Sequence, residues 1–211
     1  MIKVNSLINL LKRNKSDFFT GVPDSVLKDL STVLQKKNKQ QHIIASNEGA
    51  AVSIGIGHYL STNKIPTIYM QNSGLSNALN PLISIAHEKV YSIPLILIIG
   101  WRGSPRIKDE PQHNVKGKIT EQILKLLNIK YTILRSVSDI NKFDKQIKLA
   151  KKKKSIVACL IEQGTLEKIK NIKKKKDFYN LDKELFLKSL LENLTNNTKI
   201  ISSTGYNSRE L

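Results

Sequence analysis

The sequence has one cysteine, few arginines and no long hydrophobic run. Its single cysteine, Cys159, excludes a disulfide within the chain and a zinc site built from several cysteines. The apolar segment at 94–100 is only as long as a strand, whereas a membrane-spanning helix needs about 18 apolar residues. The first residues are periodic and interrupted by charges, which is not the pattern of a signal peptide. We therefore expect a protein of the reducing cytoplasm with no membrane partner.

The basic excess of the chain is almost entirely lysine. Of 35 Lys and Arg residues only five are Arg, and 17 Asp and Glu residues leave a formal net charge of +18. Eight lysines form the runs Lys151–Lys154 and Lys173–Lys176, and the aromatic residues lie outside both. Proteins that read nucleic acids usually mix arginine and aromatic residues into a basic surface, for base contacts and stacking. We interpret the lysines as solvated surface and expect no nucleic-acid partner.

Glycine and proline divide the chain into two parts. All six prolines and eight of the ten glycines precede residue 118, so the tight turns belong to the first part. Strand-like and helix-like segments alternate, and this βαβ repetition predicts an α/β domain at 1–165 with a doubly wound, mainly parallel sheet. A long polar loop is expected at 101–118. The expected strands are 17–20, 42–45, 67–70, 94–99, 131–134 and 155–161, and the expected helices are 4–12, 26–34, 50–60, 74–79, 120–127 and 139–150.

The end of the chain has a different character. Residues 166–181 are rich in lysine and weakly patterned, as in a linker. A helix is expected at 182–194, a strand at 199–202 and a turn from 204 onward. These elements are too few to bury a core of their own, so we expect 182–211 to begin a second, incomplete domain.

Four polar clusters follow expected strands, at 21–25, 47–49, 71–77 and 100–113. In open α/β sheets, ligands bind at the carboxyl ends of the strands, so these clusters predict a small-molecule site. The residue types alone leave simpler roles open. Glu48 suits the first turn of a helix, where a carboxylate complements the dipole, and Asp24 suits an N-cap. His113 suits an exposed surface.

Five segments carry a resemblance to a known family. They are TGVPDS at 20–25, SNEGAAVSIGIGHYL at 46–60, YMQNSGLSNALNPL at 69–82, YSIPLILIIGWRG at 91–103 and KDEPQH at 108–113. In this order and spacing they resemble the phosphonopyruvate decarboxylases, which are thiamine-diphosphate-dependent 2-oxo acid decarboxylases related to the sulfopyruvate decarboxylases. The resemblance implies a pyrimidine-binding domain at 1–165 and the beginning of a diphosphate-binding domain at 182–211.

The resemblance also implies cofactors and partners. Thiamine diphosphate and Mg²⁺ are the expected cofactors. The family's Gly-Asp-Gly motif for metal and diphosphate is absent from the 211 residues, so no metal ligand is expected here. The site is expected to be completed in a homo-oligomer or by a complementary diphosphate-domain chain, and the isolated chain is expected to be inactive. The implied reaction converts 3-phosphonopyruvate into phosphonoacetaldehyde and CO₂. The alternatives are a subunit of a sulfopyruvate decarboxylase and a catalytically inactive remnant that only binds.

The site residues follow from the same resemblance. Glu48 is the expected partner of the cofactor's aminopyrimidine ring, and Asp24 and His113 are the expected acid–base groups that also contact substrate. Other expected contacts rest on the residues themselves. Backbone N–H groups at the strand-to-helix turn suit an anion or a ring edge, so the cofactor is expected at Asn72, Ser73, Gly74 and Asn77, and an ordinary helix start is the alternative. The phosphonate or carboxylate of the substrate is expected at Arg102, Arg106 or Lys108, and a solvated charge at Arg102 is the alternative.

Overall fold

The computed structural model describes residues 1–169, 182–202 and 206–211. The chain divides into two compact units, Met1–Lys170 and Asn171–Leu211. Among the described residues, no helix combines the length and apolar character needed to cross a bilayer.

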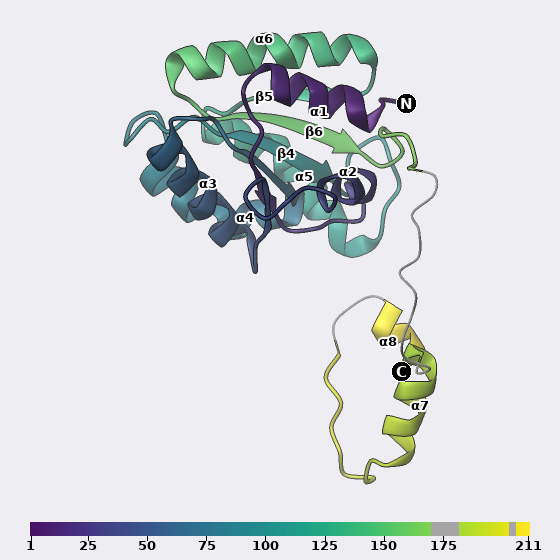
Figure 1. Ribbon diagram of the computed structural model, residues 1–211. Coiled ribbons are helices and arrows are strands. Elements are labelled where there is room, and N and C mark those ends of the chain that lie inside the picture. Colours follow the sequence, from purple (N-terminus) through teal and green to yellow (C-terminus); the bar gives the residue numbers. More distant parts are fainter. Residues whose placement is uncertain (170–181, 203–205) are drawn as a thin grey trace. The chain divides into compact units, whose positions relative to one another are not determined.

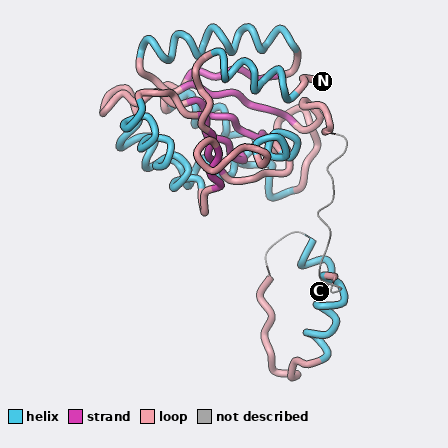
Figure 2. The backbone as a smooth tube through the Cα atoms, viewed as in Figure 1, coloured by secondary structure: helices cyan, strands magenta, loops and turns pink. Residues whose placement is uncertain are grey.

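The first unit is built on six strands that all pair in parallel, in the order β2-β1-β3-β4-β6-β5 (Figures 1 and 2). The prediction of a doubly wound, mainly parallel sheet is therefore confirmed. The strands are β1 (Phe19–Gly21), β2 (His42–Ile44), β3 (Thr67–Gln71), β4 (Ile96–Trp101), β5 (Lys130–Leu134) and β6 (Val157–Glu162).

Helices cover both faces of this sheet. In Figure 1, α1 and α6 lie over one face, and α3 and α4 lie over the other. The alternation of side chains along β4 explains the two layers. Ile96 and Ile98 join the core under α1, α2 and α6, whereas Leu97 and Ile99 join the core under α3, α4 and α5. The helices of this unit are α1 (Val4–Arg13), α2 (Lys28–Leu34), α3 (Glu48–Thr62), α4 (Leu75–Pro81), α5 (Pro111–Leu126) and α6 (Val137–Lys153), with a 3₁₀ turn η1 (Asn72–Gly74) and a π-helical turn η2 (Leu82–Ala86).

The predicted long loop at 101–118 is wrong in its second half, because α5 begins at Pro111. Proline is well suited to the first turn of a helix, where its missing N–H needs no partner. Gly117 lies inside the helix, and a methyl group there would overlap the backbone of Gly103. The glycine that predicted a turn therefore marks a close approach of two backbone segments.

The described start of the predicted linker packs on the first unit. Leu166 is buried and forms an isolated parallel bridge with Ile2. The backbone N–H of Ile169 donates to the Asp29 carboxylate at 2.7 Å. The rest of the predicted linker, 170–181, lies outside the described residues.

The second unit contains α7 (Lys183–Glu192) and α8 (Tyr206–Glu210). The Asp182 side chain caps α7 by accepting from the Leu185 N–H at 2.8 Å. The strand predicted at 199–202 is wrong, since these residues have no regular structure. A lone extended segment lacks the neighbouring strand whose backbone would satisfy its hydrogen bonds. The turn predicted from residue 204 is helical over the described residues 206–210, and 204–205 lie outside the description.

Candidate functional site

Four neighbouring strands deliver polar side chains to one edge of the sheet. Strands β2, β1, β3 and β4 lie side by side, and the chain leaves each of them at the same edge because all pairings are parallel. Glu48, Asp24, Gln71 and Arg102 follow or end these strands. The edge is therefore a site assembled from four separate loops.

Glu48 opens α3 but is not needed to cap it. The Asn47 side chain caps the helix by accepting from the Ala50 N–H at 2.8 Å. Glu48 is half-buried, and its Oε2 accepts from the Asn77 amide at 3.0 Å. A methyl group at Gly74 would overlap the Glu48 carboxyl group, so the glycine forms a cradle that receives this side chain. The structure thus brings together three of the predicted residues, Glu48, Gly74 and Asn77.

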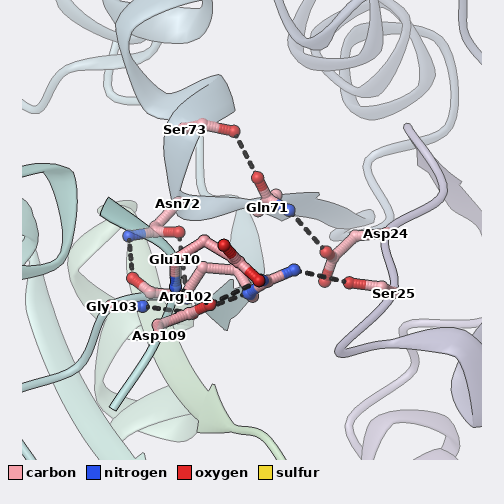
Figure 3. Close-up of polar contacts among 9 residues, drawn as sticks. All are labelled: Asp24, Ser25, Gln71, Asn72, Ser73, Arg102, Gly103, Asp109 and Glu110. Atoms are coloured by element: carbon pink, nitrogen blue, oxygen red, sulfur yellow. Dashed lines mark hydrogen bonds and ion pairs between the residues drawn. The ribbon is translucent and has the colours of Figure 1, made fainter. Parts of the chain in front are cut away.

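A chain of hydrogen bonds fixes Asp24 (Figure 3). Its Oδ2 accepts from the Leu27 N–H at 3.2 Å, and its Oδ1 accepts from the Gln71 amide at 2.9 Å. Gln71 in turn accepts from the Ser73 hydroxyl at 2.7 Å, so the predicted cofactor residue Ser73 supports the Asp24 network. Gly100 leaves room for the Asp24 carboxylate, which a methyl group would overlap. The polar residue ending the otherwise buried strand β3 was the available signal for Gln71, which the sequence analysis missed.

The surroundings of Asp24 favour its protonated form. Burial raises the pKa of Asp24, and the hydrogen bonds from Val26, Leu27 and Gln71, with the charge of Arg102, offset only part of this effect. Its carboxyl therefore retains a proton to higher pH than an ordinary aspartate.

We expect NMR titration of the chain to give Asp24 a pKa above the ordinary Asp value of about 3.9. The folded chain then holds this proton more tightly than the unfolded chain. The corresponding stability is complete below the ordinary value and is lost as pH rises through the folded-state pKa. The Asp24→Asn variant should lack this pH-dependent component in denaturant unfolding. A measured pKa at or below the ordinary value would contradict the prediction.

Arg102 is held by a carboxylate that the sequence analysis did not select. Its Nε and Nη2 donate to both Asp109 carboxylate oxygens at 2.7 and 2.5 Å, and its Nη1 donates to the Ser25 hydroxyl at 3.1 Å (Figure 3). Asp109 also accepts from the Gly103 N–H at 2.8 Å. This pairing raises the pKa of Arg102 and lowers that of Asp109. The guanidinium predicted to bind substrate is therefore already engaged within the chain.

The Arg102–Asp109 pair closes a short loop that carries two further predicted residues. Arg106 and Lys108 are both exposed, and in the part of the chain that the structure describes neither forms an ion pair. They are the cations of this loop whose charge remains available to an anion.

Asn72 joins three segments and is almost fully buried. Its amide donates to the Arg102 carbonyl and to the Thr120 hydroxyl, each at 2.9 Å, and its Oδ1 accepts from the Arg102 N–H at 3.1 Å. All of its side-chain contacts are therefore internal. The structure gives the Asn72 side chain a positioning role, and the cofactor contact predicted for Asn72 stays a prediction.

His113 lies in the first turn of α5 and is half-buried. Burial lowers its pKa, and the positive charge of Arg102 lowers it further. The backbone of Gly103, with φ +67°, lies against His113. A methyl group added at Gly103 would overlap the His113 carbonyl group. The imidazole is therefore mainly neutral at neutral pH, and the proton-donor role predicted for His113 stays a prediction.

This arrangement defines an α/β domain with a cluster of polar side chains at the carboxyl edge of its sheet. Residues 3–124 match the family described as the thiamine pyrophosphate enzyme, N-terminal TPP binding domain. The chain belongs to this family. Thiamine diphosphate is therefore the cofactor that the domain implies.

Three relatives indicate where in the family the chain lies. It is 34% identical over 119 residues to phosphonopyruvate decarboxylase of Streptomyces viridochromogenes, covering 56% of this chain and 29% of that protein. It is 36% identical over 115 residues to sulfopyruvate decarboxylase subunit alpha of Methanococcus maripaludis, covering 54% and 66%. The subunit alpha of Methanocaldococcus jannaschii is 34% identical over 125 residues, covering 59% and 71%. The chain thus spans less than a third of the phosphonopyruvate decarboxylase.

A solved structure supports the fold. A putative thiamin diphosphate-dependent enzyme from Mycobacterium smegmatis superimposes with a TM-score of 0.55 at 16% identity, covering 80% of this chain and 32% of that one.

Proposed function

We propose that the chain supplies the pyrimidine half of a thiamine-diphosphate-dependent decarboxylase that converts 3-phosphonopyruvate into phosphonoacetaldehyde and CO₂. The observation that most supports this proposal is the Glu48 carboxylate, which Asn77 and the Gly74 cradle hold at the carboxyl edge of the sheet. Similarity to phosphonopyruvate decarboxylase supports the choice of substrate. Similarity to the sulfopyruvate decarboxylase alpha subunits keeps sulfopyruvate as the second candidate.

The residues at this edge fit the cofactor that the family binds. Thiamine diphosphate would supply the nucleophilic carbon and the electron sink that decarboxylation of a 2-oxo acid requires. Glu48 would hold the aminopyrimidine ring by a hydrogen bond to a ring nitrogen, and this contact favours the ring's basic imino form. The Asn77 amide donates to one carboxylate oxygen of Glu48, and the other oxygen has no hydrogen-bond partner among the described residues. The side chain is thereby oriented before any ligand arrives.

Asp24 and His113 would divide the proton transfers between them. Asp24 would be the proton donor to the substrate carbon that loses CO₂, a role that the raised pKa of its carboxyl favours. The lowered pKa of His113 makes its imidazole a neutral hydrogen-bonding group or base beside it. Burial favours the neutral form of both groups, a protonated carboxyl at Asp24 and an unprotonated imidazole at His113, and this is the basis of the assignment.

The anionic head of the substrate would be bound by the loop that carries Arg106 and Lys108. Two exposed cations suit a phosphonate dianion better than a sulfonate monoanion, because the second charge strengthens each contact. The Arg102–Asp109 pair would fix the base of this loop.

The metal and diphosphate ligands are proposed to lie on a complementary part. The 211 residues contain no Gly-Asp-Gly sequence, and no group of three or more His, Cys, Asp or Glu side chains poised for a metal occurs among the described residues. A protein that binds diphosphate together with Mg²⁺ needs oxygen ligands for the metal, such as carboxylates. We propose that a diphosphate-binding domain, in the same gene product or on a second chain, completes the site.

The isolated chain should release no CO₂ from phosphonopyruvate in the presence of thiamine diphosphate and Mg²⁺. Adding a diphosphate-domain partner should restore turnover, with kcat/KM for phosphonopyruvate above that for sulfopyruvate. A higher kcat/KM for sulfopyruvate would make sulfopyruvate the substrate. Robust CO₂ release by the chain alone would contradict the proposal that a complementary part completes the site. An assembly that binds no thiamine diphosphate in a calorimetric titration would favour an inactive remnant.

A further inference from the structure

A second concentration of polar groups lies at the opposite edge of the sheet. A cavity of about 420 Å³ opens there, close to the amino ends of β1, β2 and β3. Its lining residues are Lys12, Lys15, Asp17, Lys37, Gln41 and Lys64. Strand β3 has five residues, so this cavity lies on the order of 15 Å from the carboxyl-edge site. The two sites therefore share no side chain.

The charges that line this cavity are unbalanced. Four ammonium groups face one carboxylate, and among the described residues none of the four makes a salt bridge or a side-chain hydrogen bond. The Lys37 Nζ lies 5.1 Å from the centroid of the Phe19 ring, which holds this ammonium group over a buried aromatic face. Burial lowers the pKa of Lys37, and repulsion from Lys12 lowers it further. The positive charges are thus held close enough to repel one another.

Helix ends explain part of this concentration of lysine but not all of it. Helices α1, α2 and α3 end at Arg13, Leu34 and Thr62, and lysines follow or belong to these ends. Each helix C-terminus carries about half a negative charge, so three of them and Asp17 offset about two and a half of the four positive charges. A net positive charge remains in a concave site, where field lines concentrate.

We propose that this cavity binds a small, free oxyanion with several negative charges, of the phosphate or pyrophosphate type. Lysine ammonium groups bind phosphate oxygens as point charges from variable directions, which suits four flexible side chains converging from different segments. The Gln41 amide adds a neutral donor at the rim. An open cavity lined by charged side chains favours a hydrated ion over an apolar ligand. This site is independent of the proposed decarboxylase function.

The test is calorimetric titration of the purified chain with inorganic pyrophosphate at low ionic strength. We expect the double variant Lys37→Gln/Lys64→Gln to weaken binding at least tenfold. The matched control is Lys145→Gln/Lys152→Gln on α6, which removes the same net charge from exposed positions outside the cavity. This control should change the affinity less than twofold. Thermal unfolding of all variants verifies that they are folded.

A gain of affinity separates a specific site from general attraction to a basic protein. Asp17→Asn removes the only carboxylate of the lining and should tighten pyrophosphate binding severalfold. Equal weakening by the α6 control, or unchanged affinity in both cavity variants, would overturn the proposal. Co-sedimentation of the chain with vesicles that contain phosphatidylserine is a further measurement. If the chain co-sediments and the double variant does not, the lysines bind a lipid surface and the oxyanion proposal is overturned.

Discussion

Replacing Glu48 by glutamine is expected to lower turnover of the proposed decarboxylase assembly by a factor of about 10² to 10⁴. Glutamine preserves the shape of the side chain and retains an oxygen that can accept from the Asn77 amide. It removes the carboxylate that would exchange a proton with the cofactor ring. The free energy of unfolding of the chain should change by no more than about 1 kcal/mol, because Glu48 is only half-buried and Asn47 caps α3. Steady-state kinetics and denaturant unfolding measure the two effects.

Glu88→Gln is the matched control for this variant. Glu88 also accepts from an asparagine amide, that of Asn128 at 2.7 Å, but it precedes β4 and so lies away from the carboxyl edge. The Glu88→Gln variant should leave turnover unchanged. Near-normal turnover in Glu48→Gln would remove Glu48 from the mechanism.

Gly74→Ala is expected to lower turnover by about 10² while the chain remains folded. Gly74 has φ −74° and ψ −13°, a conformation that alanine adopts without strain. The new methyl group would instead overlap the Glu48 carboxyl group, and this side chain is free enough to rotate away. The stability cost should therefore be about 1 to 3 kcal/mol, which leaves the chain folded. Displacing the carboxylate by about 1 Å is sufficient for the predicted loss of turnover.

Two comparisons test whether the loss acts through Glu48. In the Glu48→Gln background, Gly74→Ala should add little further loss, because both changes disable one interaction. Gly57→Ala, on the same α3 that Glu48 opens, should keep or raise stability, since no atom lies within 4 Å of the added methyl group. Additive losses in the double variant would show that Gly74 acts on another part of the site.

The sheet was predictable because its strands carry strong local signals. The continuous apolar segment at β4 is what a strand buried on both faces requires, and the structure buries all six of its residues. The start of α5 was not predictable from the same rules. Gly117 is present because a neighbouring backbone occupies the space of its side chain, and a contact between distant segments leaves no local pattern. The strand expected at 199–202 failed for a related reason, since a strand depends on a partner.

Single polar residues at the carboxyl edge could be selected from the sequence, whereas residues that act by holding a partner could not. Glu48 and Asp24 follow strands in polar segments, so they could be selected individually. Gln71 and Asp109 act by holding another side chain, and their partners are 47 and 7 residues away. The opposite pKa shifts of Asp24 and His113 come from burial, which only the folded structure provides.

The contacts around Asn72 also decide when this half-site can form during synthesis. Asn72 is tied to Arg102 and Thr120, 30 and 48 residues further along, and the Trp101 indole donates to the Gly117 carbonyl 16 residues away. No local segment contains these ties, and each closes a loop at an entropic cost before it stabilises anything. The Arg102 side of the carboxyl edge therefore acquires its geometry only after residue 120 has left the ribosome and α5 has packed. Until then a nascent chain can join Glu48 to Asn77 and Asp24 to Gln71, but it lacks the Asn72 contacts that connect them to α5.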